Sequence, residues 1–343
     1  MTYSLQQRKR RWCDFLDMAK PAQHMFIIAC DPDAPARPLP NPGNVPQRIE
    51  WSWQSYCRQM ERMNWLQDDT VPFLAVYTGT EIFAEAFGCP VVRPADNMPH
   101  ARPLVCSPAE AARIKTPRLE ETPLVRLFDI ADELCRRAGK GALLGLVDIQ
   151  SPMDIAALIW DKSHFYIAMV ETPQAVLDLA GKVNELLVAF MDEWFVRYGP
   201  EFIAHYPSYY MPRGITLSED EIGSVSQETF LELFLPELVE LSKRYGGLGM
   251  HCCANAGHQW ENLLKIPDFR LLNLCQSAQR VKEAYEFFGP RLAQMHSWSG
   301  DGAPEGWPQG YPQGSRVVMS ASAGTEDEAK ALADKLWNAC GRG

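Results

Sequence analysis

The residues of this chain whose types and spacing most favour chemistry are His251 and Cys253, in the stretch GLGMHCCANAGHQW from Gly247 to Trp260. A short apolar strand there ends in a histidine and two cysteines. Zinc prefers thiolate and imidazole ligands, and alternate residues of a strand project to the same side. His251 and Cys253 therefore form a candidate chelate, whereas Cys252 points the other way. The alternative is that His251 is a hydrogen-bonded core histidine and Cys253 a small apolar residue.

Two more donor side chains end the next two predicted strands. Cys275 closes the strand FRLLNLC, and His296 closes the strand RLAQMHS. Either residue alone could be structural. Four donors from three successive strand ends, however, predict one metal site. His258, at the start of the helix that follows the first strand, is expected to cap that helix or to orient a ligand.

An acidic segment, SEDEIGSVS, precedes this region and contains Asp220 and Glu221. A pair of carboxylates beside the site could bind a cationic substrate, orient a ligand histidine or transfer protons. We predict a catalytic role for both, and for Gln150, which follows another predicted strand. The alternative is a solvated loop in an acidic protein.

Substrate contacts are predicted from residues near the strand ends. Thr80 and Asn273 each lie at or just past the end of a strand. Tyr209, Tyr210 and Arg213 belong to an irregular stretch that could line a pocket or only pack a loop. The later loop SWSGDGAPEGWPQGYPQG is expected to be a lid with aromatic residues, or else an oligomer contact.

These side chains need a scaffold that gathers strand ends. Strands are predicted near residues 25, 73, 144, 203, 248, 270, 292 and 317, each followed by a helix or a long loop. That order predicts an α/β fold, a (β/α)8 TIM barrel, in which the carboxyl ends of all strands form one mouth. We expect one domain over residues 1–343, with an N-terminal helical extension. An open doubly wound sheet is the alternative, but no glycine fingerprint follows the first strand.

Composition excludes several classes of protein. The chain of 343 residues has a formal net charge of −10, so it lacks the basic surface that nucleic-acid binding needs. No apolar run reaches the length of about 20 residues that spans a bilayer, and the opening segment lacks the apolar core of a secretion signal. We expect a cytoplasmic protein without nucleic-acid or membrane partners, whose cysteines are reduced.

Three segments resemble the uroporphyrinogen decarboxylase superfamily. LSEDEIGSVSQETFLELFLPELVELSKRYGGLGMHCCAN is similar to the stretch in which an acidic loop precedes a helix and a strand ending in His-x-Cys. QSPMDIAALIWDKSHFYIAMVETPQAVLDLAGKV and TEIFAEAFGCPV resemble its proline-containing turn and the segment after its second strand. The resemblance covers most of the chain from about Val71 and implies a TIM barrel.

The resemblance distinguishes two branches. The decarboxylase proper has an Arg-Gln-Ala-Gly-Arg motif after the first strand and an aspartate after the second. Here those positions hold IIACDPDAPAR and YTGTEIF, and an acidic loop with Asp31 and Asp33 would repel an acid-rich tetrapyrrole.

The other branch moves methyl groups between a corrinoid protein and a thiol, with zinc held by His-x-Cys and a later cysteine. His251 and Cys253 match the first half of that pattern. The later cysteine is replaced by SASAGTEDEA, and Cys340 lies in the last helix, so either Cys275 or His296 completes the site or the metal is absent.

The resemblance implies zinc-assisted methyl transfer that involves a corrinoid protein and a thiol or a methylated small molecule. Two alternatives stay open. One is a metal-free decarboxylase of a porphyrinogen-like or other small acid, which would be a lyase. The other is a non-catalytic protein that binds a corrinoid or tetrapyrrole. A homodimer is also left open.

Overall fold

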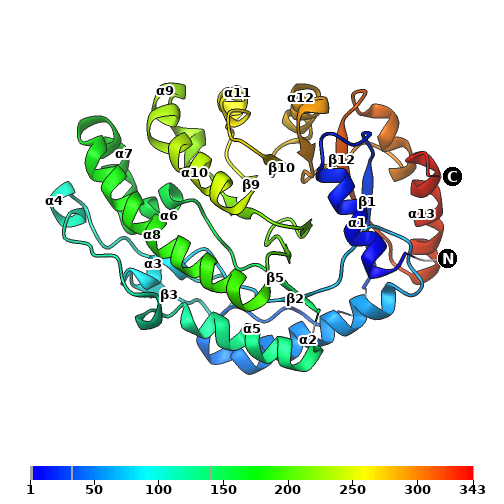
Figure 1. Ribbon diagram of the computed structural model, residues 1–343, viewed down its shortest axis with the longest axis horizontal. Helices are drawn as coiled ribbons and strands as arrows, with labels where there is room; N and C mark the ends of the chain where they lie inside the picture. The colour runs from blue at the N-terminus through cyan, green and yellow to red at the C-terminus, as the bar shows by residue number, and fades with distance from the viewer. Residues whose placement is uncertain (1–2, 32–33, 140, 343) are drawn as a thin grey trace.

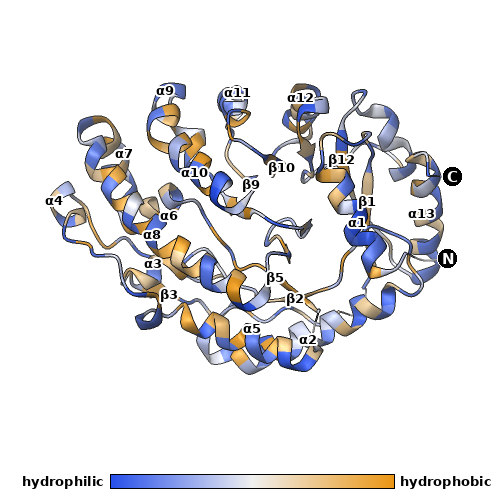
Figure 2. Cartoon of the chain, in the orientation of Figure 1, coloured by the Kyte–Doolittle hydropathy of each residue, from blue (hydrophilic) through white to orange (hydrophobic). Residues whose placement is uncertain are grey.

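The computed structural model describes residues 3–31, 34–139 and 141–342. Asp33, which belongs to the predicted acidic loop, lies outside these ranges. Short parallel strands form the inside of the molecule and helices surround them (Figure 1). Colouring by hydropathy shows apolar and polar stretches alternating along the longer helices, as expected for helices with one buried face (Figure 2).

Two sheets make up the barrel wall. The six-stranded sheet has the spatial order β1 (Met25–Ala29), β12 (Arg316–Ser322), β11 (Ala293–Gln294), β10 (Phe269–Leu274), β9 (Leu248–Cys252) and β8 (Ile215–Ser218), all parallel. The second sheet has the order β2 (Phe73–Ala75), β5 (Leu143–Gly145), β6 (Phe202–Ile203) and β7 (Tyr210–Met211), in which β7 is antiparallel. A small hairpin of β3 (Val91–Val92) and β4 (His100–Ala101) lies apart from both.

The helices follow the strands in the predicted alternation. They are α1 (Leu5–Leu16), α2 (Val45–Arg62), α3 (Ile82–Ala86), α4 (Pro108–Ala111), α5 (Val125–Ala138), α6 (Pro152–Ile159), α7 (Lys162–Glu171), α8 (Pro173–Tyr198), α9 (Gln227–Thr229), α10 (Leu235–Tyr245), α11 (Trp260–Leu263), α12 (Ala278–Phe288) and α13 (Glu326–Ala339). The fold is the predicted TIM barrel.

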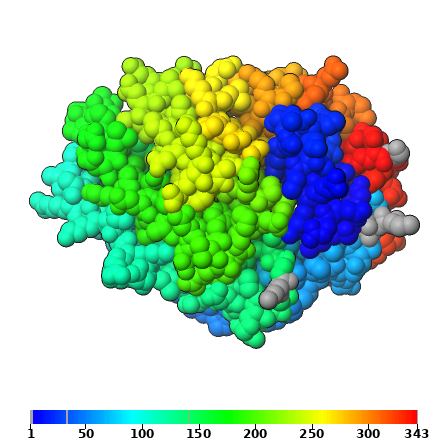
Figure 3. Space-filling model, viewed as in Figure 1, coloured from blue at the N-terminus to red at the C-terminus, as the bar shows by residue number. Residues whose placement is uncertain are grey.

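The predicted N-terminal extension is α1, which covers the amino-terminal end of the barrel. Trp12 of α1 stacks on Tyr209 with ring centroids 6.1 Å apart, and Arg316, the first residue of β12, donates to the Phe15 carbonyl at 2.9 Å. On the surface, this segment packs beside the C-terminal helix (Figure 3). The mouth of the barrel is therefore at the opposite, carboxyl-terminal end.

The first seam between the two sheets joins β5 to β8. Gln150 and Ser218 form an isolated parallel bridge, in which Ser151 N–H donates to the Ser218 carbonyl at 2.8 Å. The sequence predicted only one strand in this part of the chain, near residue 203, and an irregular stretch after it. That prediction was incomplete, because β8 also belongs to the barrel. β8 has only four residues, so its apolar pattern is too short to be recognised in the sequence. It follows Gly214, whose φ of +121° favours glycine.

At the second seam, between β1 and β2, carboxylates take the place of a neighbouring strand. Phe26 N–H donates to Asp69 Oδ2 at 2.9 Å, and Ile28 N–H donates to Asp68 Oδ2 at 3.0 Å. Asp68 in turn makes a buried ion pair of 2.5 Å with Arg8 of α1. Side chains thus accept two N–H groups of the β1 edge, and β1 and β2 do not pair with each other.

Pro236 divides the helix before β9. The helix begins with α9, widens to a π-turn at Phe230–Phe234 and continues as α10 from Leu235. A proline lacks the N–H that would bond back along the helix and clashes with the carbonyl four residues earlier, so the wider turn accommodates it.

The predicted lid loop packs on the outer helices. Its short 3₁₀ helix (Pro304–Gly310) lies against α13, and Tyr285 of α12 donates to the Trp298 carbonyl at 2.8 Å. Tyr311 also contacts Tyr285, with ring centroids 5.0 Å apart. The aromatic residues that we expected to close on a ligand are instead part of this outer cluster.

Candidate functional site

His251 lies at the carboxyl end of β9, where Asn273 of β10 fixes its ring. The register of the two strands sets these residues side by side, and His251 Nδ1 is 2.5 Å from Asn273 Oδ1. The Asn273 amide nitrogen also donates to the Met295 carbonyl, so its oxygen must face the imidazole. The hydrogen-bond partners therefore assign the proton of His251 to Nδ1 and leave a lone pair on Nε2. Asn273 was predicted to contact substrate, but both of its polar groups are taken by the protein.

The Nε2 lone pair of His251 faces Cys253. Nε2 lies 2.9 Å from Cys253 Sγ. The Cys253 thiol also contacts the thiol of Cys275, the residue that directly follows β10. Burial, with smaller effects of Asp220 and Cys275, raises the pKa of Cys253 to about 11. The structure therefore brings together three of the four predicted metal donors.

His296 is not part of this group, and the prediction that it binds the metal was wrong. Strand register pairs Gln294 with Leu272, one residue away from Asn273, so Gln294 and His296 face the side opposite to His251. His296 Nδ1 accepts from Leu274 N–H at 3.0 Å, and Nε2 donates to Gln294 Oε1 at 3.0 Å. Burial lowers the pKa of His296 to about 3, so the ring is neutral and fully used.

The acidic segment contributes one carboxylate to the site. Asp220 Oδ1 accepts the N–H of Cys253 at 2.5 Å, so it holds the backbone of that residue. Glu221 is turned away, because its carboxylate accepts hydrogen bonds from Lys162 and Tyr166 of α7. The predicted catalytic role of Glu221 is therefore not supported by its position.

The buried carboxylate of Asp154 holds the backbone of the acidic segment. Asp154, in the first turn of α6, accepts the N–H groups of Asp220 at 2.7 Å and of Glu221 at 3.0 Å. Burial raises the pKa of Asp154 to about 7, and burial together with Asp154 raises the pKa of Glu219 well above its usual range. Asp154 and Glu219 thus support the loop that carries Asp220.

An Asp–His pair shares a small cavity with His251. Asp148, after β5, lies 3.5 Å from His205, after β6, measured from Oδ2 to Nε2. Burial raises the pKa of Asp148 and lowers the pKa of His205. The ring of Tyr206 meets His251 edge to face at 4.8 Å, and Tyr209 closes the cavity from below. Sequence reasoning missed His205, because its strand has only two residues.

The other predicted residues divide between the mouth and the opposite end. Tyr209 and Tyr210 both line a larger cavity inside the barrel. Arg213 precedes β8, so it lies at the amino-terminal end of the barrel, and its prediction as a substrate contact was wrong. Thr80 is exposed and lies outside the cavity that holds His251. Gln150 takes part in the seam between the sheets, and its buried Oε1 has no hydrogen-bond partner in the part of the chain that the structure describes.

The donor set fits zinc chemically but is not preformed. In the part of the chain that the structure describes, no three His, Cys, Asp or Glu side chains are arranged as a finished metal site. Tetrahedral zinc would hold a nitrogen and a sulfur ligand about 3.5 Å apart, whereas His251 Nε2 and Cys253 Sγ are 2.9 Å apart. Small rotations of the His251 and Cys253 side chains would have to break the hydrogen bond between them, so that both atoms could bind the metal.

The fold and this cavity at the strand ends define a TIM-barrel protein with its site at the mouth, where enzymes of this fold have theirs. The sequence model of the uroporphyrinogen decarboxylase (URO-D) family matches residues 47–287, and the chain belongs to that family. Among solved structures, a methyltransferase from Methanosarcina mazei is similar, with a TM-score of 0.66 and 12% identity over 98% of this chain and 99% of that one. At this identity the likeness shows the fold. No curated protein matches the sequence.

No helix among the described residues is long and apolar enough to cross a membrane.

Proposed function

We propose that this protein transfers a methyl group between a corrinoid, carried by a separate protein, and the sulfur of a small thiol, and that His251, Cys253 and Cys275 hold a zinc ion for this purpose. The observation that carries the proposal is the convergence of one imidazole and two thiols from neighbouring strand ends. The family and the named methyltransferase of the same fold are consistent with it. Bound zinc would favour the thiolate form of the substrate at neutral pH.

The residues around the donors have separate tasks in this proposal. Asn273 holds the Nδ1 proton of His251 and thereby directs Nε2 toward the metal. Asp220 fixes the backbone of Cys253. The Asp148–His205 pair is placed to accept the proton that the substrate thiol loses, because burial keeps His205 neutral and Asp148 lies beside it.

The test combines metal analysis with activity. We expect about one zinc per chain in the native protein and its loss in His251→Ala, Cys253→Ala and Cys275→Ala. Cys57→Ser is the matched control, since Cys57 is an exposed cysteine on α2, and it should retain zinc. Demethylation of methylcobalamin by a thiol, followed by absorbance, should fall with zinc content. Unchanged zinc and unchanged rates in all three variants would refute the assignment.

A metal-free decarboxylase is the second candidate, and the Asp148–His205 pair favours it. In that reaction the bond between the carboxyl carbon and its neighbour breaks, carbon dioxide leaves, and Asp148, whose pKa burial raises, would supply a proton through His205 to the electron pair left on carbon. His205→Ala should then abolish carbon dioxide release while removal of metal with a chelator leaves it unchanged. Stoichiometric zinc in protein purified without added metal would count against this candidate.

A further inference from the structure

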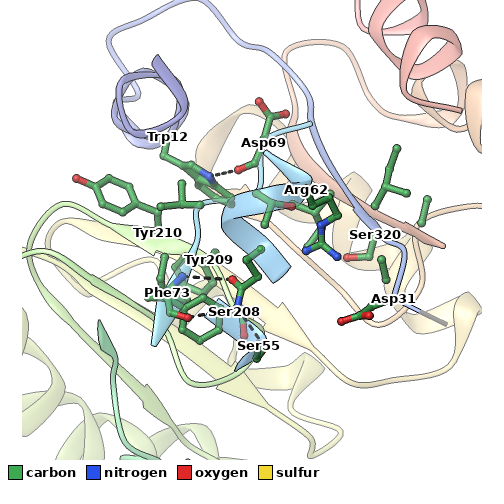
Figure 4. A pocket seen from close by; sticks show the side chains of 18 residues that line it. Trp12, Asp31, Ser55, Arg62, Asp69, Phe73, Ser208, Tyr209, Tyr210 and Ser320 are labelled. Atoms are coloured by element: carbon green, nitrogen blue, oxygen red, sulfur yellow. Dashed lines mark hydrogen bonds between the residues drawn. The ribbon is translucent and has the colours of Figure 1, made fainter. Parts of the chain in front are cut away.

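A cavity lies in the seam between β1 and β2. Its free volume is about 330 Å³, and we call it the seam pocket. Figure 4 shows aromatic side chains on one side of the view and Arg62, Ser320 and Asp31 on the other. The residues that the argument uses are Trp12, Phe73, Tyr209, Tyr210, Arg62 and Asp31.

The pocket stays open without help from a ligand. Gln59 of α2 pairs with both backbone groups of Phe73, accepting its N–H at 3.2 Å and donating to its carbonyl at 3.2 Å. On the other side, Asp68 and Asp69 accept the N–H groups of β1. These side-chain contacts hold polar groups of both strand edges, so the walls of the pocket are already in place.

The inner part of the pocket is apolar and aromatic. The indole nitrogen of Trp12 already donates to the Asp69 carbonyl at 2.8 Å, and Tyr209 is almost fully buried. With Phe73 and Tyr210 these rings form walls suited to a flat, ring-sized apolar group. A volume of this size is at the small end of the range for small-molecule sites, roughly 300–1,000 Å³.

The outer end of the pocket carries a guanidinium that has no acidic partner among the described residues. Arg62 donates only to the Cys30 carbonyl, at 3.3 Å, and pairs with no carboxylate of the described residues. Arg58, one turn earlier on α2, makes a 2.8 Å ion pair with Asp31. Arg58 therefore pairs with the carboxylate of Asp31, and the guanidinium of Arg62 stays available to a ligand.

We propose that the seam pocket binds an amphipathic carboxylate, with a ring-sized apolar body among the aromatic walls and the carboxylate on Arg62. The flat guanidinium can hold a carboxylate by two parallel hydrogen bonds. Tyr209 lines both this pocket and the small cavity with His251, so the two are neighbours. That the bound carboxylate also carries the thiol of the methyl transfer rests on the proposed function, whereas the binding itself does not.

Isothermal titration calorimetry with two probes tests the proposal. The full chain, in the presence of a metal chelator, is titrated with 3-phenylpropanoate and with the neutral 3-phenylpropanamide. We expect the carboxylate to bind at least tenfold more tightly than the amide. Arg62→Ala should remove that preference and leave amide binding within about twofold, and Arg62→Lys should restore only part of it.

Two further variants separate the outcomes. Arg136→Ala removes an exposed arginine on α5 and should change nothing, and Ser55→Phe, in the wall of the pocket, should weaken both probes. Thermal unfolding of each variant confirms folding. Absence of binding by the wild-type chain, or an equal loss of both probes in Arg62→Ala, would overturn the proposal. Because zinc is removed, a failure of the metal assignment leaves this result unaffected.

Discussion

Asn273 offers the sharpest test of how the site is organised, because its side chain contacts the ring of His251 and the carbonyl of Met295. Asn273→Ala removes the 2.5 Å contact with His251 Nδ1 and leaves the Met295 carbonyl without its donor. Loss of a group that orients a metal-ligating histidine typically costs 10–100-fold in metal affinity, or about 1.4–2.7 kcal/mol. The unsatisfied carbonyl should cost a further 1–3 kcal/mol or so of folding stability.

The two effects are measured separately. Competition with a chromogenic chelator gives zinc affinity, and urea unfolding of the metal-free protein gives stability. Asn262→Ala is the matched control, since Asn262 is also a buried asparagine with two side-chain partners but lies on α11. It should lose stability and keep zinc affinity. If Asn273→Ala binds zinc as tightly as the wild type, the proposed orientation of His251 is wrong.

Three other predictions concern residues around the site. Glu221→Gln should leave the rate of methyl transfer within about twofold of the wild type, because the Glu221 carboxylate pairs with α7 and not with the metal donors. A tenfold loss of rate in the methylcobalamin assay would show that Glu221 is catalytic after all. Burial raises the pKa of Glu81 from 4.5 to about 7, so between these pH values the folded state holds a proton that the unfolded state has lost, and the free energy of unfolding should fall as the pH rises. Glu81→Gln should flatten this part of the plot of unfolding free energy against pH, as measured by urea unfolding. An unchanged slope would contradict the burial argument. Gly249→Ala should lose about 1–3 kcal/mol, because a Cβ there would stand 2.0 Å from the Tyr209 hydroxyl, whereas Gly181→Ala on α8 has open space and should gain stability in the same thermal-unfolding assay.

The barrel was predictable because its signal is repeated along the chain. Eight predicted strand positions all fall in or beside observed strands, and α8 begins at the predicted Pro173. The register of β9 and β10 then carries His251, Cys253 and Cys275 to one side, as the alternation of strand residues requires.

The errors arise where strands are too short to show a period. β11 has two residues, so the sequence could not tell which face His296 would take. β8 was hidden in an irregular stretch, so Arg213 was placed at the mouth when it precedes the strand. Glu221 was predicted from its type alone, and its partner lysine is 59 residues away in the chain. Such pairings depend on tertiary contacts that a local pattern does not contain.

X-ray absorption at the zinc edge of the purified protein tests the central claim most directly. If His251, Cys253 and Cys275 hold the metal, the spectrum should show about two sulfur atoms near 2.3 Å and one imidazole nitrogen near 2.0–2.1 Å, and Cys275→Ala should give no signal from bound zinc. His296→Gln should leave the spectrum unchanged. A spectrum without sulfur ligands, or a native protein free of bound zinc, would contradict the account.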